Sequence, residues 1–229
     1  MASTLPPPDA DAQSHSAHLG EVIQEQVIAA GGHVAFWKFM ELALYAPGLG
    51  YYSAGAHKFG PGGDFTTAPE RSPLFSACVA DALTPVLQQL GPDAVFMEIG
   101  GGSGAFAETC LAKLLANDAL PARYAILEPS ADLRERQEER LQSRLPPLLF
   151  ELVEWLDGPI QDPWNGVLFA NEVIDALPTP RFTIRDGEVF EEYVSLDGEG
   201  RFLRTDRPAD PMLAAAVRHE LHGKVAFYN

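Results

Sequence analysis

The residues with the clearest chemical potential lie in one short segment, residues 98–104, which read Glu-Ile-Gly-Gly-Gly-Ser-Gly. Glycine at four of five successive positions costs backbone entropy, so we expect a specific need for it. Without a Cβ, the main chain and the free N–H groups at a helix N-terminus can approach a ligand closely. Residues 95–99 favour a strand and residues 105–116 favour a helix. The segment therefore predicts a strand, turn and helix that bind a nucleotide-type cofactor; the alternative is a turn that binds nothing.

This segment fits two cofactor patterns. Gly100, Gly102 and Ala105 satisfy the dinucleotide pattern G-x-G-x-x-G/A. The acid at position 98 with the glycines at 100, 102 and 104 satisfies the pattern E-x-G-x-G-x-G, which is typical of S-adenosylmethionine (SAM) methyltransferases. The candidate cofactor-binding residues in this segment are Glu98, Gly100, Gly101, Gly102, Ser103 and Gly104.

Acidic residues follow three of the predicted parallel strands. Glu98 lies near the end of the first, Glu128 ends the second, and Glu172 follows the fourth. Ligands of such sheets bind outside the carboxyl ends of the strands, and Glu128 lies close to the offset, roughly 20 residues past the glycines, at which a carboxylate binds ribose hydroxyls. The alternative for Glu128 is a solvated residue before a turn. SAM carries a cationic sulfonium whereas NAD carries a pyrophosphate, so an acidic rim without Arg favours SAM.

A second polar cluster, Asn171, Glu172 and Asp175, stands where a substrate beside the cofactor would lie. If this segment begins a helical turn, Glu172 and Asp175 share a face and could hold a guanidinium by charge-assisted hydrogen bonds. The alternative is that Asn171 caps the turn and the acids only favour its N-terminus.

The order of elements predicts an α/β fold with a Rossmann-like parallel sheet and an antiparallel β-meander appended to that sheet. We expect a disordered tail over 1–17, an N-terminal helical and loop region over 18–92, and the cofactor domain over 93–229 with the meander at 180–206. The loop over 45–69 is a candidate lid or binding loop; the alternative is an irregular loop held by its aromatic residues. The expected elements are helices at 19–30, 36–44, 72–91, 105–116, 130–141 and 211–221 and strands at 95–99, 124–127, 148–153, 167–170, 181–185, 188–196 and 201–205.

Charge and composition narrow the classes of partner. The 229 residues include 16 basic and 32 acidic residues, a net charge of −16, which argues against nucleic acid and suits a cationic substrate. The alternative is that the acid only keeps the surface soluble. No apolar run is long enough for a membrane span, no His or Cys spacing suggests a metal site, and Cys78 and Cys110 are expected to be buried thiols. We expect a cytoplasmic protein.

Several separated motifs occur in one order: residues 39–40 with 43–47, Gly50-Tyr51-Tyr52, residues 59–60 with 63–65 and 67–70, residues 98–104, Asn171-Glu172 with 175–178, and residues 192–194. In this the chain resembles the MidA-type SAM-dependent methyltransferases over roughly residues 20–205. Mitochondrial members of that family assist respiratory complex I assembly by methylating an arginine. Family members are considerably longer, so we expect the chain to be incomplete at its C-terminus.

The resemblance implies SAM on the glycine segment with Glu128 on its ribose. It implies that Asp64 and its loop close near the methyl donor and that Asn171, Glu172 and Asp175 face the acceptor. The candidate catalytic residues are therefore Asp64, Asn171, Glu172 and Asp175, and Asn171 is also a candidate cofactor-binding residue. The expected function is SAM-dependent methylation of a protein nitrogen, most plausibly arginine, with a complex I subunit as one candidate substrate. The alternatives are an assembly or interaction protein that retains the fold without catalysis, and an NAD-dependent oxidoreductase.

Overall fold

A computed structural model describes residues 8–53 and 66–221 of the chain. Its contacts divide the chain into two compact units. The first, here called the meander unit, comprises Met1–Gly50 and Leu177–Asn229; the second, the parallel-sheet unit, comprises Tyr51–Ala176. This division differs from the expected boundary at 92/93, because helix α4 (Pro73–Leu90) contributes Ala80 and Leu87 to the core of the parallel sheet.

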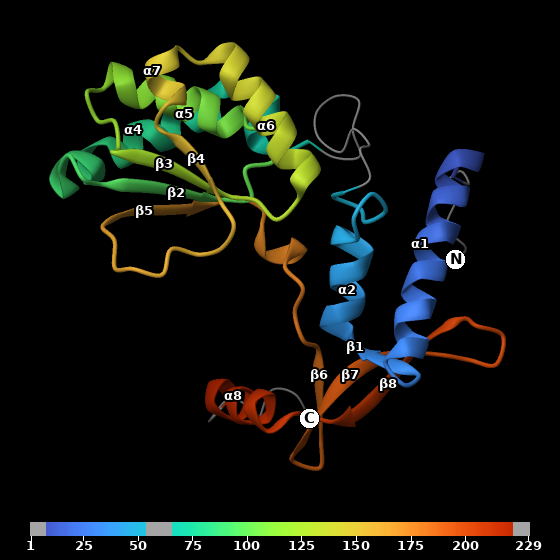
Figure 1. Ribbon diagram of the computed structural model, residues 1–229. Coiled ribbons are helices and arrows are strands. Elements are labelled where there is room, and N and C mark those ends of the chain that lie inside the picture. The colour runs from blue at the N-terminus through green and yellow to red at the C-terminus, as the bar shows by residue number, and fades with distance from the viewer. Residues whose placement is uncertain (1–7, 54–65, 222–229) are drawn as a thin grey trace. The chain divides into compact units, whose positions relative to one another are not determined.

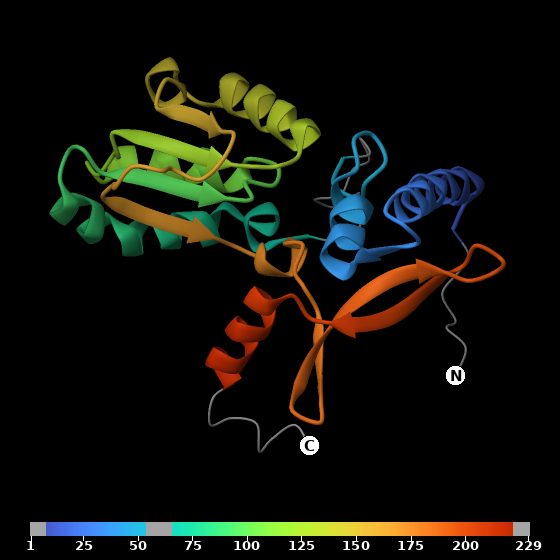
Figure 2. The ribbon, with the colours of Figure 1, turned by 60° about the horizontal axis from the view of Figure 1, so that its bottom comes forward.

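The parallel-sheet unit is built on four parallel strands in the order β4-β3-β2-β5. These are β2 (Val95–Ile99), β3 (Arg123–Leu127), β4 (Val153–Leu156) and β5 (Gly166–Ala170). Their connections contain α5 (Ala105–Ala116), α6 (Ala131–Arg144) and the short α7 (Pro147–Phe150), and α3 (Ala68–Arg71) and α4 precede the sheet. In Figures 1 and 2, α4, α5 and α6 lie on the same side of the sheet. The fold is the predicted α/β class.

Stacked aromatic side chains form the centre of the core between this sheet and its helices. The rings of Phe96 and Tyr124 on neighbouring strands stack with centroids 4.8 Å apart, and those of Phe106 and Phe169 stack at 4.0 Å. Such pairs add to the stabilisation from burying large apolar surfaces. The close β2–β5 pairing needs glycine at position 166, because a Cβ there would lie 1.9 Å from the Val95 carbonyl oxygen.

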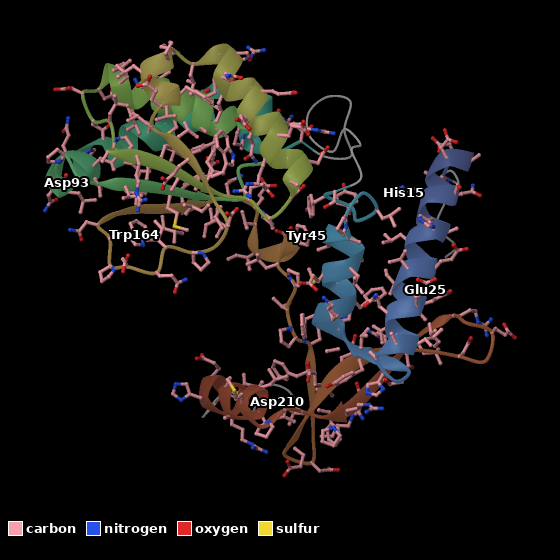
Figure 3. The ribbon with its side chains drawn as sticks, in the orientation of Figure 1. His15, Glu25, Tyr45, Asp93, Trp164 and Asp210 are labelled. Atoms are coloured by element: carbon pink, nitrogen blue, oxygen red, sulfur yellow. The ribbon has the colours of Figure 1, made fainter. Side chains whose placement is uncertain are left out.

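Trp164, which precedes β5, also lies close to position 166. Figure 3 shows Trp164 in the connection that leads to the strand. A Cβ at position 166 would also lie 2.8 Å from the Trp164 ring, so this side chain would have to shift as well.

The meander unit has its own four-stranded antiparallel sheet. Its strands are β1 (His33–Ala35), β6 (Phe182–Arg185), β7 (Glu188–Leu196) and β8 (Phe202–Pro208), and its helices are α1 (Ala10–Ala29), α2 (Phe36–Tyr45) and α8 (Pro211–Leu221). The long strand β7 pairs with the other three, and Figure 2 shows it beside β8 as a twisted ribbon. Ile23, Val27, Val34 and Val194 form a core between α1, β1 and β7.

Two expectations about the meander unit are corrected. The meander does not extend the parallel sheet but forms a separate sheet with β1, whose three residues are too few to show a sequence period. The expected disordered tail over 1–17 is helical from Ala10, because the Asp9 side chain caps α1 by accepting a hydrogen bond from the Ala12 N–H at 2.8 Å.

Helix α8 begins and ends as predicted, with Asp210, labelled in Figure 3, accepting from the Met212 N–H at 2.8 Å.

Two further expectations fail in the parallel-sheet unit. Residues 148–153 do not form one strand, since Pro147 starts the helical turn α7 and the strand begins only at Val153. Proline suits the first turn of a helix because its fixed φ matches the helix and its missing N–H is not needed there. Cys78 is exposed on α4, whereas Cys110 is buried as expected.

Candidate cofactor site at the carboxyl edge of the parallel sheet

The glycine turn after β2 has a backbone that only glycine adopts without strain. Gly100, Gly102 and Gly104 have φ values of 69°, 55° and 79°. Other residues pay a steric cost in this left-handed region. The Gly100 N–H donates to the Leu127 carbonyl at 2.9 Å, which fastens the turn to β3, and Gly104 is the N-cap of α5. The predicted strand, turn and helix are therefore confirmed.

The neighbouring Gly101 has little room for a side chain. A Cβ at this position would lie 3.0 Å from Gln137 Nε2 and 3.1 Å from Ile126 Cγ2. Side-chain packing therefore fills the volume beneath the turn. The sequence pattern did not distinguish this packing glycine from the three whose backbone conformation demands glycine.

Glu98 lies beneath the turn with its carboxylate buried. It is 3% exposed, and Glu98 Oε2 accepts a hydrogen bond from the Tyr124 hydroxyl at 2.7 Å. Desolvation raises the Glu98 pKa to about 7; the Tyr124 hydrogen bond opposes this shift, and the nearby Glu128 charge adds to it. Because Glu98 is buried and bonded to Tyr124, it helps to hold β2 and β3 together below the turn. Direct contact between Glu98 and a cofactor stays a prediction.

Glu128 lies beside the glycine turn, as the sequence spacing requires. Its carboxylate is 5% exposed and accepts from the Ser130 N–H at 3.1 Å and from Gln137 Nε2 at 3.3 Å. Burial raises the pKa of Glu128, and hydrogen bonds from Ser130, Gln137 and the Gly102 main chain lower it. The structure thus brings the two principal candidates for cofactor binding, the turn and Glu128, into contact.

The polar segment after β5 reaches the same edge. Ile99, Leu127 and Ala170 end their strands in register, so the segments after them adjoin. A Cβ on Gly100 would lie 2.8 Å from Val173 Cγ2, which places the Asn171–Asp175 segment against the glycine turn.

The prediction that Glu172 and Asp175 share one face of a helical turn is wrong. Glu172 has a left-handed φ of 54°, and only Ile174–Ala176 form a 3₁₀ turn after it. A positive φ interrupts a right-handed helix, so Glu172 precedes the turn that contains Asp175. Both carboxylates are exposed and Asn171 is half-buried. Roles of Asn171, Glu172 and Asp175 toward an acceptor stay predictions.

Tyr52 is a site residue missing from the candidates drawn from the sequence. Ser130, which caps α6, donates its hydroxyl to the Tyr52 carbonyl at 2.7 Å. Burial and the charges of Asp175 and Glu128 raise the pKa of the Tyr52 phenol, so its hydroxyl lies within reach of both charges. The Gly50-Tyr51-Tyr52 motif was the available signal, although it named no role.

Ser103 in the turn is held by charged neighbours. Its hydroxyl donates to Glu70 of α3 and accepts from Arg140 Nη1 at 3.2 Å. Arg140 also binds the Glu108 carboxylate, with Nε to Oε2 at 2.7 Å. These contacts fix the side of the turn that faces α6, a role for Ser103 that the cofactor pattern did not indicate.

Within 8–53 and 66–221, no group of three or more His, Cys, Asp or Glu residues is arranged to hold a metal ion. No described helix is both long and apolar enough to cross a membrane. Asp64, a candidate catalytic residue, lies outside the described residues.

The fold and site together define a class of protein. A parallel sheet with a glycine turn, a helix N-terminus and a carboxylate at one edge is the architecture of α/β proteins that bind nucleotide-type cofactors. Residues 78–225 match the family described as "Putative S-adenosyl-L-methionine-dependent methyltransferase". The chain belongs to this family, whose cofactor is SAM.

Solved structures agree with this assignment. A Burkholderia thailandensis protein crystallised with S-adenosyl-homocysteine is 39% identical and matches 93% of this chain and 56% of its own, with a TM-score of 0.79. A native crystal structure from the same organism is 37% identical over 93% of this chain and 54% of its own, with a TM-score of 0.76. The predicted class I methyltransferase fold is confirmed.

Curated relatives carry more specific names. The Drosophila melanogaster "Protein arginine methyltransferase NDUFAF7 homolog, mitochondrial" is 27% identical over 216 residues, which is 83% of this chain and 49% of the relative. The Caenorhabditis elegans protein of the same name is 26% identical over 228 residues, or 88% of this chain and 52% of the relative. The chain spans about half the length of these relatives.

Proposed function

We propose that the chain is the cofactor-binding part of a protein arginine N-methyltransferase. The observation that carries the proposal is the exposed acidic segment, Glu172 to Asp175, whose Val173 lies against the glycine turn at Gly100. This places negative charge for a cationic acceptor beside the candidate cofactor site. The names of the two curated relatives support arginine as the acceptor.

The residues present suit SAM. The left-handed turn at Gly100, Gly102 and Gly104 has no Cβ to keep a ligand from its main chain, and Gly100 and Gly102 are only half-buried. Glu128 lies beside Gly102, where it would accept hydrogen bonds from the ribose hydroxyls. When bound, SAM supplies a sulfonium-linked methyl group for transfer to a nucleophile.

The acceptor would be oriented by the acids after β5. Glu172 and Asp175 would hold a guanidinium by charge-assisted hydrogen bonds and favour its approach by their charge. The guanidinium nitrogen held by Glu172 and Asp175 would take up the methyl group that SAM supplies, the methyl–sulfur bond would break, and a guanidinium proton would pass to solvent. The rate enhancement would come mainly from positioning and electrostatics, because no described residue of this segment is a strong base.

A transfer assay with Glu172→Gln tests this role. The enzyme is incubated with methyl-labelled SAM and either arginine-containing peptides or purified subunits of respiratory complex I, our proposed acceptor class. Arginine methylation is then read by mass spectrometry. We expect Glu172→Gln to lose transfer almost completely and to keep SAM affinity, because the change removes charge on the acceptor side only.

Glu139→Gln, at an exposed carboxylate on α6, is the matched control and should leave transfer unchanged. Unchanged transfer in Glu172→Gln would contradict the proposed role of Glu172. SAM binding by the unsubstituted chain without transfer to any of these acceptors would favour an assembly protein that retains the fold.

A further inference from the structure

Gln137 on α6 is a polar side chain with no solvent exposure, and all three of its hydrogen bonds bear on the site. Its Nε2 donates to the Gly102 carbonyl at 2.9 Å and to Glu128 Oε2 at 3.3 Å. Its Oε1 accepts from the indole Nε1 of Trp155 at 2.9 Å. One amide therefore joins the glycine turn after β2, the acid after β3 and a side chain of β4.

The partners dictate which way this amide points. The Trp155 indole nitrogen can only donate, whereas the Gly102 carbonyl and an ionised Glu128 can only accept. The oxygen of Gln137 must therefore face Trp155 and its NH₂ group must face the turn. A flipped amide would break all of these hydrogen bonds and set like groups against each other at a partly buried site, which is costly.

The same amide occupies the space beneath the turn. A Cβ on Gly101 would lie 3.0 Å from Gln137 Nε2, so the turn rests directly on this group. Any change in the amide position would move the Gly102 carbonyl and the Glu128 carboxylate together.

We propose that Gln137, oriented by Trp155, is a positioning residue that sets the glycine turn and Glu128 for cofactor binding. This inference rests on the proposed function, since it assumes that the site binds SAM. Gln137 acts in two ways: it fixes where the turn and the carboxylate stand, and its N–H donor favours the ionised form of Glu128. Burial raises the Glu128 pKa, and the Gln137 hydrogen bond is among the contacts that oppose that shift.

The test is titration calorimetry of the whole chain with S-adenosyl-homocysteine between about pH 5.5 and about pH 8.5. Gln137→Leu keeps side-chain volume and removes all three hydrogen bonds. We expect at least about tenfold weaker binding, since a hydrogen bond to a charged group is lost. We also expect the pH at which affinity falls off on acidification to move upward, because Glu128 loses a donor to its ionised form. Gln142→Leu, at an exposed position of α6, should match the unsubstituted chain.

Trp155→Phe provides the second variant if Gln137→Leu fails to fold. It keeps an aromatic ring beside Phe150, removes the donor that orients the amide, and also removes part of the ring volume. We expect weaker binding and an upward pH shift in the same direction, both smaller than for Gln137→Leu.

Three distinguishable outcomes would each overturn a different claim. Unchanged binding in Trp155→Phe at every pH overturns the orienting role. Weaker binding by a folded Gln137→Leu without any pH shift shows a packing role only and overturns the positioning of Glu128. A folded, unsubstituted chain that does not bind S-adenosyl-homocysteine overturns the proposed function itself.

Discussion

At the scale of single residues, two buried carboxylates, Glu98 and Glu128, lie close together. The Glu128 charge adds to the upward shift of the Glu98 pKa, yet the hydrogen-bond partners of the two carboxylates differ. The Glu98 carboxylate accepts a hydrogen bond from the Tyr124 hydroxyl. The Glu128 carboxylate accepts hydrogen bonds from a main-chain N–H and from the Gln137 amide beside the turn. Glu128 is therefore better equipped to remain ionised, and Glu98 is held near the boundary of protonation at neutral pH.

This difference predicts how stability depends on pH. The folded-state pKa of Glu98 is about 7, above the ordinary value of 4.5, so folding favours its protonated form. Its contribution to stability is fully present below about pH 4.5 and is lost as the pH rises through about 7. Glu98→Gln removes the titration and keeps an acceptor for Tyr124. We expect the variant to be more stable than the unsubstituted chain at about pH 8, by up to about 3 kcal/mol.

Denaturant unfolding at about pH 5 and about pH 8 measures the effect. The gain in unfolding free energy of Glu98→Gln over the unsubstituted chain should shrink at the lower pH. The exposed control Glu139→Gln should show no such change. An advantage that is equal at both pH values would show that Glu98 is not titrating in this range.

At the scale of elements, we propose that cofactor binding depends on the glycine turn. Gly104 and Gly187 share a φ of 79°, but Gly104 begins α5 at the site and Gly187 lies in the β6–β7 hairpin of the meander unit. A Cβ on Gly104 would make ordinary contacts with Gln137 and Arg140, and one on Gly187 would meet nothing within 4 Å. The two positions thus carry similar backbone strain in different elements.

Alanine at each position separates stability from binding. We expect Gly104→Ala and Gly187→Ala each to lose about 1 kcal/mol of unfolding free energy, because alanine is strained at this φ. Only Gly104→Ala should weaken S-adenosyl-homocysteine binding, measured by calorimetry. Equal affinities for the two variants would show that the turn conformation at position 104 does not govern binding.

The elements also show what the sequence could predict. The strand, turn and helix around residues 95–116 and the helix over 211–221 were predicted closely, because local glycine and apolar patterns specify them. The strand over 148–153 was wrong, since a short apolar run fits a helix or a strand and the proline at 147 decided for a helical turn. The role of Gln137 depends on three elements meeting in space, and no local pattern reports that.

At the scale of the whole molecule, the described residues form separate cores in the two units. The parallel-sheet core includes Phe96, Tyr124 and Phe106, whereas Val194 packs with residues of α1 and β1 in the meander unit. The meander unit is assembled from both ends of the chain, and β1 pairs with β7 across the intervening parallel-sheet unit in the sequence. Such pairing over a long sequence separation is invisible to local pattern analysis.

Separate cores predict a local response to core damage. Val194→Ala removes two buried carbons and should cost roughly 1.5–2.5 kcal/mol. By hydrogen exchange, we expect protection to fall in β1 and β7 while β2 and β3 keep theirs. Val86→Ala, at an exposed position of α4, should change neither. An equal loss of protection in both sheets would show that the two units unfold together.

The central claim is that the edge built from the glycine turn and Glu128 binds SAM. Isothermal titration of the 229-residue chain with SAM, with NAD as the control, tests it most directly. We predict binding of SAM in the micromolar range and none of NAD. A folded sample that binds NAD in preference to SAM, or that binds neither, would contradict the claim.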